Sequence, residues 1–371
     1  MEIRLVQPGE EAACNDFHNR LHHDHRLISH WRWEFVENGF DRPPIPFALA
    51  KDGDRIVGTQ AFIPIRMIDR DGIFWTAKSE ATLIDPDYRG QQLFEKMYDL
   101  LFQYAEEKQL AYIWGFTPAI KAFTRLQFDI PGETAQIYFP FSSRSVTSMT
   151  SKISGADSAG IQNRFKNIAI RGGAAVASKL SALRLFLTSH TLSPGITIRA
   201  METPDPQAGA CCERFIKQFG GTTIYRDAAY LQWRLFNNPF VRSVVKGIYE
   251  GETLLGWVAY TLGDDGMGYL VDIFVACDPA RHQPGRLVRL LLREAIVGTR
   301  SMGATGIRGW QVNQHPFDQL VLRESRKVGF YHVKRGHFAV IRSSSAGKGR
   351  TGNQNFNDWY ISRIFTEGVL S

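Results

Sequence analysis

The sequence has few cysteines, and they form none of the patterns that hold metals or build disulfide frameworks. Only four of the 371 residues are cysteine, Cys14, Cys211, Cys212 and Cys277, and their spacing fits no zinc site. Because the neighbours Cys211 and Cys212 are poor disulfide partners, a reducing compartment, the cytoplasm, is expected. The N-terminal sequence contains acidic residues and has no apolar core, unlike a secretory signal.

Long apolar runs are missing as well. No stretch approaches the roughly 18 apolar residues of a membrane-spanning helix, so we expect no membrane span. The sequence also has no Walker loop, no Ser-His-Asp context and no nucleic-acid-binding motif. Although the sequence pI is 9.2, we therefore expect no nucleic-acid partner.

Histidine is concentrated in one place, but without the pattern of a metal-binding helix. The cluster contains His18, His22, His23 and His25. His18 and His22 are four residues apart and can share a helix face. No glutamate follows the first histidine as in the His-Glu-x-x-His helix of zinc proteases. We expect no metal here and interpret the cluster as a surface or substrate-cleft feature.

Acidic residues are distributed unevenly along the chain. Residues 1–140 contain 15 Lys and Arg against 21 Asp and Glu, a net charge of −6. Residues 141–195 contain seven basic residues and one acid, and residues 196–371 contain 22 basic residues against 15 acidic ones. An acidic first region suits a substrate with ammonium groups better than one with phosphates. Solvated surface charge without a function is the alternative.

The chain contains an internal repeat. The segment around Trp33 parallels the segment around Trp233. Each precedes two strand-like runs joined by a polar turn, which contains Gly53 in the first copy and Gly251 in the second. An Asp-Pro pair and an amphipathic helical pattern then follow in both copies. The shared order predicts two related mixed α/β domains, residues 1–140 and 196–371.

The segment between the copies, residues 141–195, is polar and then basic. Residues 141–160 are rich in Ser, Thr and Gly and predict a linker. From Ile161 to Leu187 apolar residues recur at helical spacing, although Gly172-Gly173 is expected to weaken or break the helix. We interpret this basic amphipathic helix as packing against the chain's own domains or a second subunit, in a possible homodimer. Binding to an anionic membrane surface is the alternative.

The most informative run is Asp85–Phe94. It follows a strand-like stretch, Ile73–Ile84, and opens a helical pattern that begins at Leu93. At such a turn the free N–H groups of the helix N-terminus and the positive end of the helix dipole attract anions. The run therefore predicts a pyrophosphate site.

This run resembles the acetyl-coenzyme A loop of the GNAT N-acetyltransferase superfamily, Arg-Gly-x-Gly-x-Gly/Ala after a strand that ends in x-Pro-x-x. Pro86, Arg89 and Gly90 match, whereas Gln92 and Phe94 replace the second glycine and the third small residue. The resemblance implies two tandem GNAT-like acyl-CoA N-acyltransferase domains joined by a helical connector. It also implies acetyl-CoA as co-substrate.

The resemblance places the coenzyme in the first copy. The implied binding residues are Leu83, Ile84, Arg89, Gly90, Gln91, Gln92, Leu93 and Phe94. The pantetheine arm is expected where the strand carrying Ala81–Ile84 splays from the next strand, at Leu110–Trp114. In the second copy Pro284 removes an N–H donor from the corresponding loop, so that copy is interpreted as degenerate. A weaker second coenzyme site that uses Arg281 and Gly285 is the alternative.

The candidate general base is Glu80, at a position where many GNAT enzymes carry a glutamate. A carboxylate there can take the proton of an attacking amine, and a solvent-facing strand residue is the alternative. The tyrosine that serves many GNAT enzymes as general acid is replaced by Phe123. Tyr98 and Tyr112 lie nearby in the sequence, and we expect both to be core residues.

These residues predict an acetyl-CoA-dependent N-acetyltransferase acting on a primary amine of a small molecule or peptide. One alternative is a Fem-type aminoacyl transferase that uses aminoacyl-tRNA, although no sustained heptad pattern suggests the coiled-coil arm of that class. Another is a non-catalytic acyl-CoA-binding protein. Aromatic residues expected to line the acceptor cleft are Trp31, Trp33, Phe62, Trp75 and Trp114.

Overall fold

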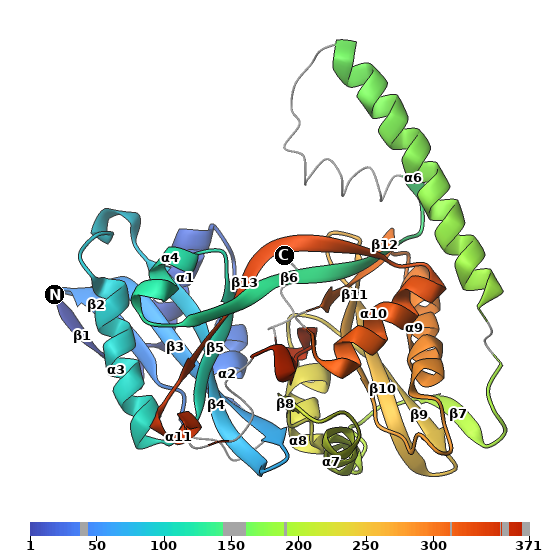
Figure 1. Cartoon of the computed structure of the whole chain (residues 1–371). Helices are drawn as coiled ribbons and strands as arrows, with labels where there is room; N and C mark the ends of the chain where they lie inside the picture. The colour runs from blue at the N-terminus through green and yellow to red at the C-terminus, as the bar shows by residue number, and fades with distance from the viewer. Residues whose placement is uncertain are drawn as a thin grey trace.

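The computed structural model describes residues 1–37, 44–143, 161–188, 191–311, 314–348, 350 and 356–365. It shows a mixed α/β protein in which two similar halves lie side by side (Figure 1). We call residues 1–140 the N-terminal half and residues 196–371 the C-terminal half. The linker predicted over residues 141–160 lies mostly outside the described residues.

The N-terminal half contains six strands and four helices among its described residues. The strands are β1 (Glu2–Leu5), β2 (Phe47–Asp52), β3 (Arg55–Asp69), β4 (Gly72–Ile84), β5 (Tyr112–Thr117) and β6 (Asp129–Pro140). The helices are α1 (Glu11–His22), α2 (Ile28–Phe35), α3 (Leu93–Glu107) and α4 (Ile120–Arg125). The strand, turn and helix expected around Asp85–Phe94 correspond to β4, a 3-10 turn and α3.

The C-terminal half repeats this order. Its strands are β7 (Ile196–Ala200), β8 (Thr222–Ile224), β9 (Val244–Glu250), β10 (Thr253–Leu262), β11 (Gly268–Val275), β12 (Gly306–Gln311), β13 (Tyr331–Ser343) and β14 (Trp359–Tyr360). Its helices are α7 (Ala208–Phe219), α8 (Ala228–Leu231), α9 (Pro284–Ser301), α10 (Pro316–Val328) and α11 (Ser345–Lys348). The two predicted hairpin turns occur as expected, with Gly53 and Gly251 both at φ 57°.

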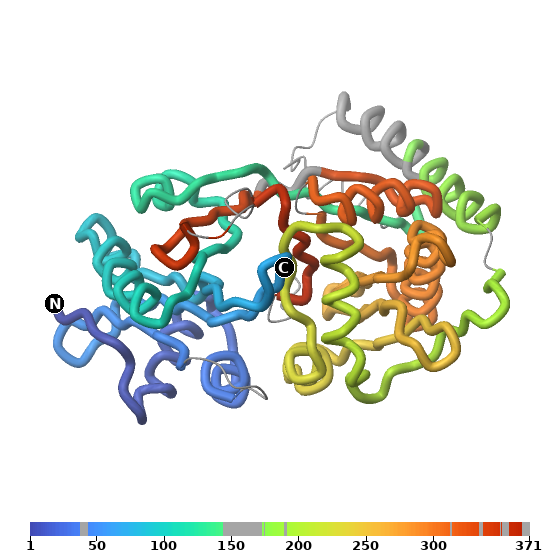
Figure 2. Tube along the Cα trace, turned by 60° about the horizontal axis from the view of Figure 1, so that its bottom comes forward, coloured from blue at the N-terminus to red at the C-terminus, as the bar shows by residue number. Residues whose placement is uncertain are grey.

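One mixed sheet runs through both halves. Its strand order is β1-β2-β3-β4-β5-β13-β6-β12-β11-β10-β9-β7, with β8 and β14 off this path. Strand β6 pairs with β12 of the other half, and β13 returns to pair with β5 (Figure 2). Each half therefore donates a strand beside the other's central strands. The domain boundaries remain a prediction, because the sheet crosses from one half to the other without a break.

The repeat seen in the sequence brings equivalent residues into contact. The rings of Trp33 and Trp233 lie 5.5 Å apart. The indole N–H of Trp33 donates to the carbonyl of Trp233 at 3.1 Å, and that of Trp233 donates to the carbonyl of Trp33 at 3.0 Å. Such reciprocal bonds are the mark of an isologous contact. The two copies of the repeat therefore contact each other through equivalent residues.

Helix α6 (Ile161–Leu187) connects the halves and differs from the expectation in two ways. Its backbone continues through Gly172-Gly173, so the predicted break is wrong. Among the described residues, Ala177, Ser181 and Leu185 have hydrogen bonds with the body. The stripe residues Val176, Leu180, Leu183 and Leu187 do not pack against the chain's own halves but are exposed, and packing against a second subunit stays a prediction. The sequence pattern identified an apolar face but not which face the body covers.

Candidate active site

A cavity of about 1460 Å³ borders both halves. From the N-terminal half it is lined by the outer part of β4, the turn before α3, the end of β5 and helix α4. From the C-terminal half Trp310, His337, Arg363 and Phe365 reach it. Of the predicted site residues, Glu80, Ile84, Arg89, Gly90, Gln92, Leu93 and Phe94 line the cavity, whereas Leu83 and Gln91 are not among its lining residues.

The cavity opens where two parallel strands separate. Strands β4 and β5 pair only at Ala77 with Ile113 and at Lys78 with Trp114. Strand β13 pairs with the other edge of β5 along its whole length, and beyond Lys78 strand β4 continues along the cavity paired with β3. The backbone of β4 past Lys78 thus has no partner on the β5 side in the ladder. This is the gap in which the resemblance to GNAT enzymes predicts the pantetheine arm.

A bulge at Ala81 changes the direction of β4 beside this gap. The register with β3 shifts between Thr59 and Ala61, and Ala81 has a φ of 53°. A positive φ is unfavourable for a residue with a side chain, so the surrounding structure must hold it. The hydroxyl of Thr59 donates to the carbonyl of Ala81 at 2.9 Å, and the buried Gln60 amide donates to that of Glu80 at 3.2 Å. Side chains of β3 therefore fix the bulge.

The turn between β4 and α3 presents backbone groups to the cavity. Gly90 has a φ of 82°, and a Cβ added there would meet no atom within 4 Å. Gln92 is left-handed at φ 58° and precedes α3 without a side-chain cap on the first N–H groups. Backbone positions with a positive φ are most easily occupied by glycine. This explains why the superfamily pattern has a glycine where this chain has Gln92. The open space and the uncapped helix N-terminus fit a pyrophosphate.

Asp85 anchors this turn. Its carboxylate accepts from the backbone N–H of Asp87 at 3.3 Å and from the Arg55 guanidinium at 2.8 Å. Burial alone would raise the pKa of Asp85, but the hydrogen bonds from Arg55 and Asp87 outweigh it and hold that pKa below its usual range. Asp85 is therefore a structural residue of the turn.

The two departures from the superfamily pattern lie against each other. Phe94, in place of a small residue, and Phe123, in place of the tyrosine, pack edge to face with ring centroids 5.6 Å apart. Both rings line the cavity. Tyr98 packs behind them, wholly buried, and its hydroxyl shares a 2.6 Å hydrogen bond with Ser79. Burial raises the pKa of Tyr98 well above its ordinary value, and Tyr98 is not among the cavity-lining residues.

Glu80 meets a residue that sequence reasoning missed. The ammonium group of Lys78 forms an ion pair with the Glu80 carboxylate. The Lys78 side chain is 5% exposed and that of Glu80 is 28% exposed, and both line the cavity. Residues two apart on a strand share a face, so the pair Lys78-x-Glu80 was visible in the sequence. The neighbouring cation stabilises the carboxylate form of Glu80, which is the form that can accept a proton.

The aromatic wall of the cavity comes from other residues than those predicted. Trp31, Trp33, Phe62 and Trp114 are core residues, and Trp75 does not line the cavity either. Instead, Phe116 of β5 lies 4.9 Å from Trp310 and 4.8 Å from Phe365, measured between ring centroids. Two of these three rings belong to the C-terminal half. Only the crossing of the sheet brings them to the site, so local sequence patterns could not indicate them.

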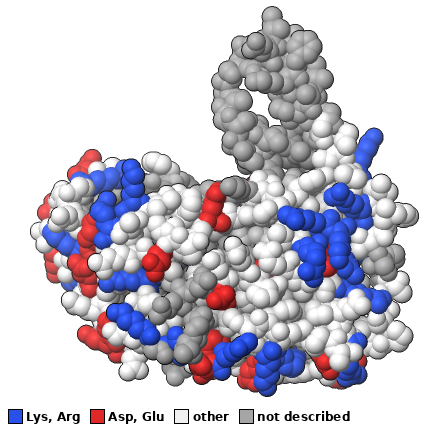
Figure 3. All heavy atoms as spheres, in the orientation of Figure 1, with Lys and Arg blue, Asp and Glu red and all other residues white. Residues whose placement is uncertain are grey.

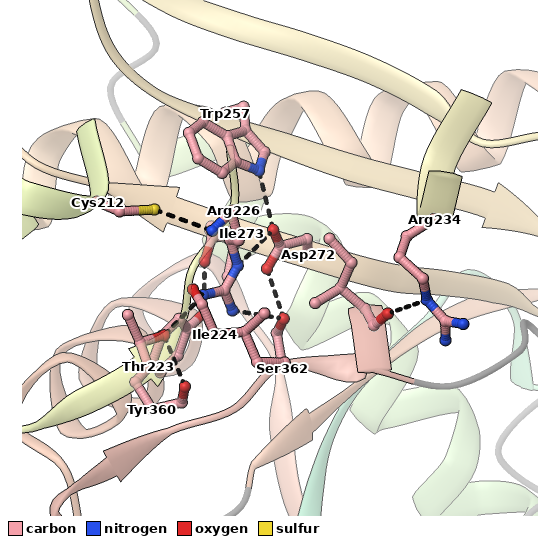
Figure 4. A network of polar contacts seen from close by, with 11 residues as sticks. Cys212, Thr223, Ile224, Arg226, Arg234, Trp257, Asp272, Ile273, Tyr360 and Ser362 are labelled. Atoms are coloured by element: carbon pink, nitrogen blue, oxygen red, sulfur yellow. Dashed lines mark hydrogen bonds and ion pairs between the residues drawn. The ribbon is translucent and has the colours of Figure 1, made fainter. Parts of the chain in front are cut away.

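The equivalent gap in the C-terminal half is filled. Strands β11 and β12 pair only from Gly268 to Leu270 and then separate, as β4 and β5 do. Buried Asp272 follows this point and forms an ion pair with Arg226 at 3.1 Å (Figure 4). The hydroxyl groups of Ser362 and Tyr360 donate to Asp272 and to the carbonyl of Ile273. The chain's own segment 359–363 thus occupies this gap, which retains only about 10 Å³.

The start of α9 also differs from the start of α3. A Cβ on Gly285 would lie 2.9 Å from the carboxylate of Glu324, which binds Arg289, Arg323 and Lys327. The side chain of Glu324 is 3% exposed. Arg281 is paired with Glu250. A carboxylate against the first turn of α9 disfavours a second anion there.

The histidine cluster lies at the edge of the cavity. His18, His22, His23 and Asp24 are lining residues, and the rings of His18 and His22 are 4.6 Å apart. Within the described residues no group of three or more His, Cys, Asp or Glu has the geometry to hold a metal ion. In this same part of the chain no helix is long and apolar enough to cross a membrane.

Residues 2–124 match the family model described as "Acetyltransferase (GNAT) domain". The N-terminal half is a GNAT acetyltransferase domain. The match begins at β1 and ends within α4, so it contains the turn at Gly90, the bulge at Ala81 and Glu80. The chain thus carries a domain of the acyltransferase class. No curated protein matches the sequence at a significant level.

Solved structures extend the GNAT fold to the whole chain. A probable N-acyltransferase from Enterococcus faecalis V583 aligns with a TM-score of 0.60 and 9% identity, over 93% of this chain and 72% of that one. A tandem GNAT protein from the clavulanic acid biosynthesis pathway aligns with a TM-score of 0.54 and 10% identity, over 93% and 98%. The N-myristoyltransferase of Saccharomyces cerevisiae, solved with myristoyl-CoA, aligns with a TM-score of 0.57 and 10% identity, over 92% and 79%. The tandem GNAT fold expected from the sequence is confirmed.

Proposed function

We propose that the protein is an acetyl-CoA-dependent N-acetyltransferase that modifies a primary amine and binds its coenzyme in the N-terminal half. The observation that carries this proposal is the contrast between the two GNAT gaps. The gap beside β4 opens into a large cavity with Glu80 and the uncapped N-terminus of α3, whereas the gap beside β11 is filled by residues 359–363. A single catalytic centre in residues 1–140 follows.

The coenzyme is proposed to lie along the outer part of β4 and the turn that follows. The N–H groups around Gly90 and at the start of α3 would bind its pyrophosphate, and the space beside Gly90 is open. Arg89 is exposed beside them and supplies a positive charge. The pantetheine arm would extend toward the bulge at Ala81, between β4 and β5. Leu83 and Ile84 would offer it backbone groups.

In the proposed reaction the amine nitrogen attacks the thioester carbonyl carbon, and the carbon–sulfur bond breaks. Glu80 accepts the proton that the attacking nitrogen must lose. Its ion pair with Lys78 holds the carboxylate beside the gap. Phe123 has no proton to give, and Tyr98 is buried behind it. The thiolate leaves without a tyrosine acid, which is feasible because a thiol is far more acidic than an amine.

The proposed acceptor is a small molecule or peptide that presents a primary amine. Glu80 and Asp24 line the cavity and favour an approaching ammonium group, and the rings of Phe116, Trp310 and Phe365 provide an apolar wall. We propose that the reaction takes place in the cytoplasm.

A panel assay tests this function. The purified chain is mixed with acetyl-CoA and a series of amines, and thiol release is recorded with each. Release that depends on a primary amine and disappears in Glu80→Gln supports the proposal. Calorimetry with acetyl-CoA, longer acyl-CoAs and aminoacyl-tRNA identifies the ligand class. Coenzyme binding without turnover over a wide panel would favour a non-catalytic acyl-CoA-binding protein, and binding of aminoacyl-tRNA alone would favour the aminoacyl transferase.

A further inference from the structure

Helix α6 carries an apolar row on a face turned away from the body. Figure 1 shows the helix projecting from the two halves, with its C-terminal end beside α9 and α10. The exposed fractions of the apolar residues near that end are 67% for Val176, 51% for Leu183, 80% for Phe186 and 71% for Leu187. Exposed apolar side chains in contiguous groups mark a binding surface more often than isolated ones do.

The row is continuous from Val176 to Leu187. Val176, Leu180, Leu183 and Leu187 follow at intervals of four, three and four residues, which places them on one face. The opposite face holds the helix to the body. There Ser181 donates to the carbonyl of Gly329 at 2.7 Å. The apolar row is thus presented outward by a helix whose other face is fixed.

Basic residues flank this row on both sides. By helical spacing Lys179 lies on one side of the row and Arg184 on the other, and both are exposed. Arg184 also lines a hollow together with Arg326 and Lys327 of α10. Figure 3 shows basic side chains gathered on this side of the molecule. The helix itself contains five Lys and Arg and no acidic residue.

We propose that the C-terminal part of α6, with the adjacent basic end of α10, docks on an anionic lipid bilayer. An apolar row bordered by Lys and Arg is the arrangement with which surface helices insert their apolar side chains below the headgroups and leave cations among the phosphates. The described part of the chain has no helix able to cross a membrane, so the helix would lie on the surface.

Charge distinguishes this occupant from two others. A second copy would bring two helices of like charge together, and no acidic residue of α6 is available to compensate. A nucleic acid would use the basic residues but would leave the apolar row in water, because phosphate contacts need no apolar side chains. An anionic bilayer can bury the apolar row and also bind the cations that border it.

Vesicle sedimentation tests the proposal with the full chain. The protein is expected to partition into phosphatidylcholine vesicles that contain phosphatidylserine, at least tenfold more than into pure phosphatidylcholine, and less so in high salt. The double substitution Leu183→Glu with Phe186→Glu, and separately Lys179→Glu with Arg184→Glu, should each reduce binding about tenfold or more. The matched control is Ile73→Glu, at a 48%-exposed apolar residue in β4, which should bind like the wild type.

The proposal does not depend on the enzymatic one, because vesicle binding is measured without acyl-CoA. All variants should keep the thermal midpoint of the wild type, since the substituted side chains are exposed. Equal binding to neutral and anionic vesicles, or equal losses in Ile73→Glu, would overturn the proposal. So would light scattering that shows a dimer dissociated by the Leu183→Glu and Phe186→Glu pair without any vesicle binding. Binding to RNA in place of vesicles would also overturn it.

Discussion

The two halves share a fold and differ in what fills the gap between their central strands. In the N-terminal half Lys78 is the last residue of β4 that pairs with β5, and its ion-pair partner Glu80 follows; both line a cavity. In the C-terminal half Asp272 follows the corresponding point, fully buried and paired with Arg226. A strand gap is therefore not a site by itself. It becomes one only when the chain leaves it open.

The buried pair of the filled gap is expected to give the largest single effect. Arg226→Met leaves Asp272 charged and without its cation in the core, which should reduce the free energy of unfolding by about 3–5 kcal/mol. Lys78→Met in the open gap should cost about 1 kcal/mol or less, because water reaches Glu80 from the cavity. Urea unfolding of both variants measures the difference. Equal costs would mean that the two gaps are equally hydrated.

The C-terminal half should also make stability depend on pH, through the buried His315 that precedes α10. Burial lowers the pKa of His315 to about 4, against the opposing hydrogen bond to the carbonyl of Gly220. Nδ1 of His315 accepts from the N–H of Phe317 at 3.1 Å, and protonation would break this cap of α10. Because the unfolded chain takes up the proton first, stability should fall as the pH decreases from about 6.5 to 4, by roughly 3 kcal/mol at most.

Thermal unfolding at a series of pH values measures this effect. His315→Asn keeps an acceptor for the helix cap and has no titrating group, so its stability should vary less over the same pH range. A wild type and a variant with identical pH profiles would show that His315 does not contribute.

Glu80→Gln should remove most of the activity of the open gap while the protein stays folded. Loss of a general base costs at least about a hundredfold in kcat, or about 2.7 kcal/mol. The KM for acetyl-CoA should change little, and the acidic limb of the pH–rate profile should disappear. Glu107→Gln, at an exposed carboxylate on the far end of α3, serves as the control. A proportional loss in both variants would speak against Glu80 as the base.

The smallest effect concerns coenzyme affinity. Gly90→Val should weaken acetyl-CoA binding at least about tenfold, or 1.4 kcal/mol, by obstructing the approach of the pyrophosphate. The equivalent Gly285 is an unsuitable control, because a Cβ there would meet Glu324. Gly195 has a similar φ of 79° and equally open surroundings, so Gly195→Val carries the same backbone strain without touching the site. Calorimetry measures the acetyl-CoA affinity of the two variants. Equal affinity losses would show that Gly90 is not part of the coenzyme site.

Most of the N-terminal site could be predicted because it is local in sequence. Glu80, the turn at Gly90 and the start of α3 lie within one strand–turn–helix unit, so their order alone brings them together. The hydrogen bonds from Thr59 and Gln60 to the bulge were not predictable, since bulges leave no clear sequence signal. The packing of Phe94 on Phe123 was not predictable either, although each residue departs from the superfamily pattern. Contact between two unusual residues depends on how α3 and α4 are oriented.

The sequence by itself determined the repeat, the hairpins, the helices and the element that carries the coenzyme turn, because each depends on periodicity and on residues close together in the chain. Tertiary structure alone decided that β6 and β13 cross between the halves, that Trp310 and Phe365 join the first cavity and that residues 359–363 fill the second gap. These contacts join segments that are far apart in the sequence, or they depend on which face of an element is covered. Local hydrophobic spacing determines neither the long-range contacts nor the face that becomes covered. As α6 shows, the same spacing occurs on a face that packs and on a face that remains exposed.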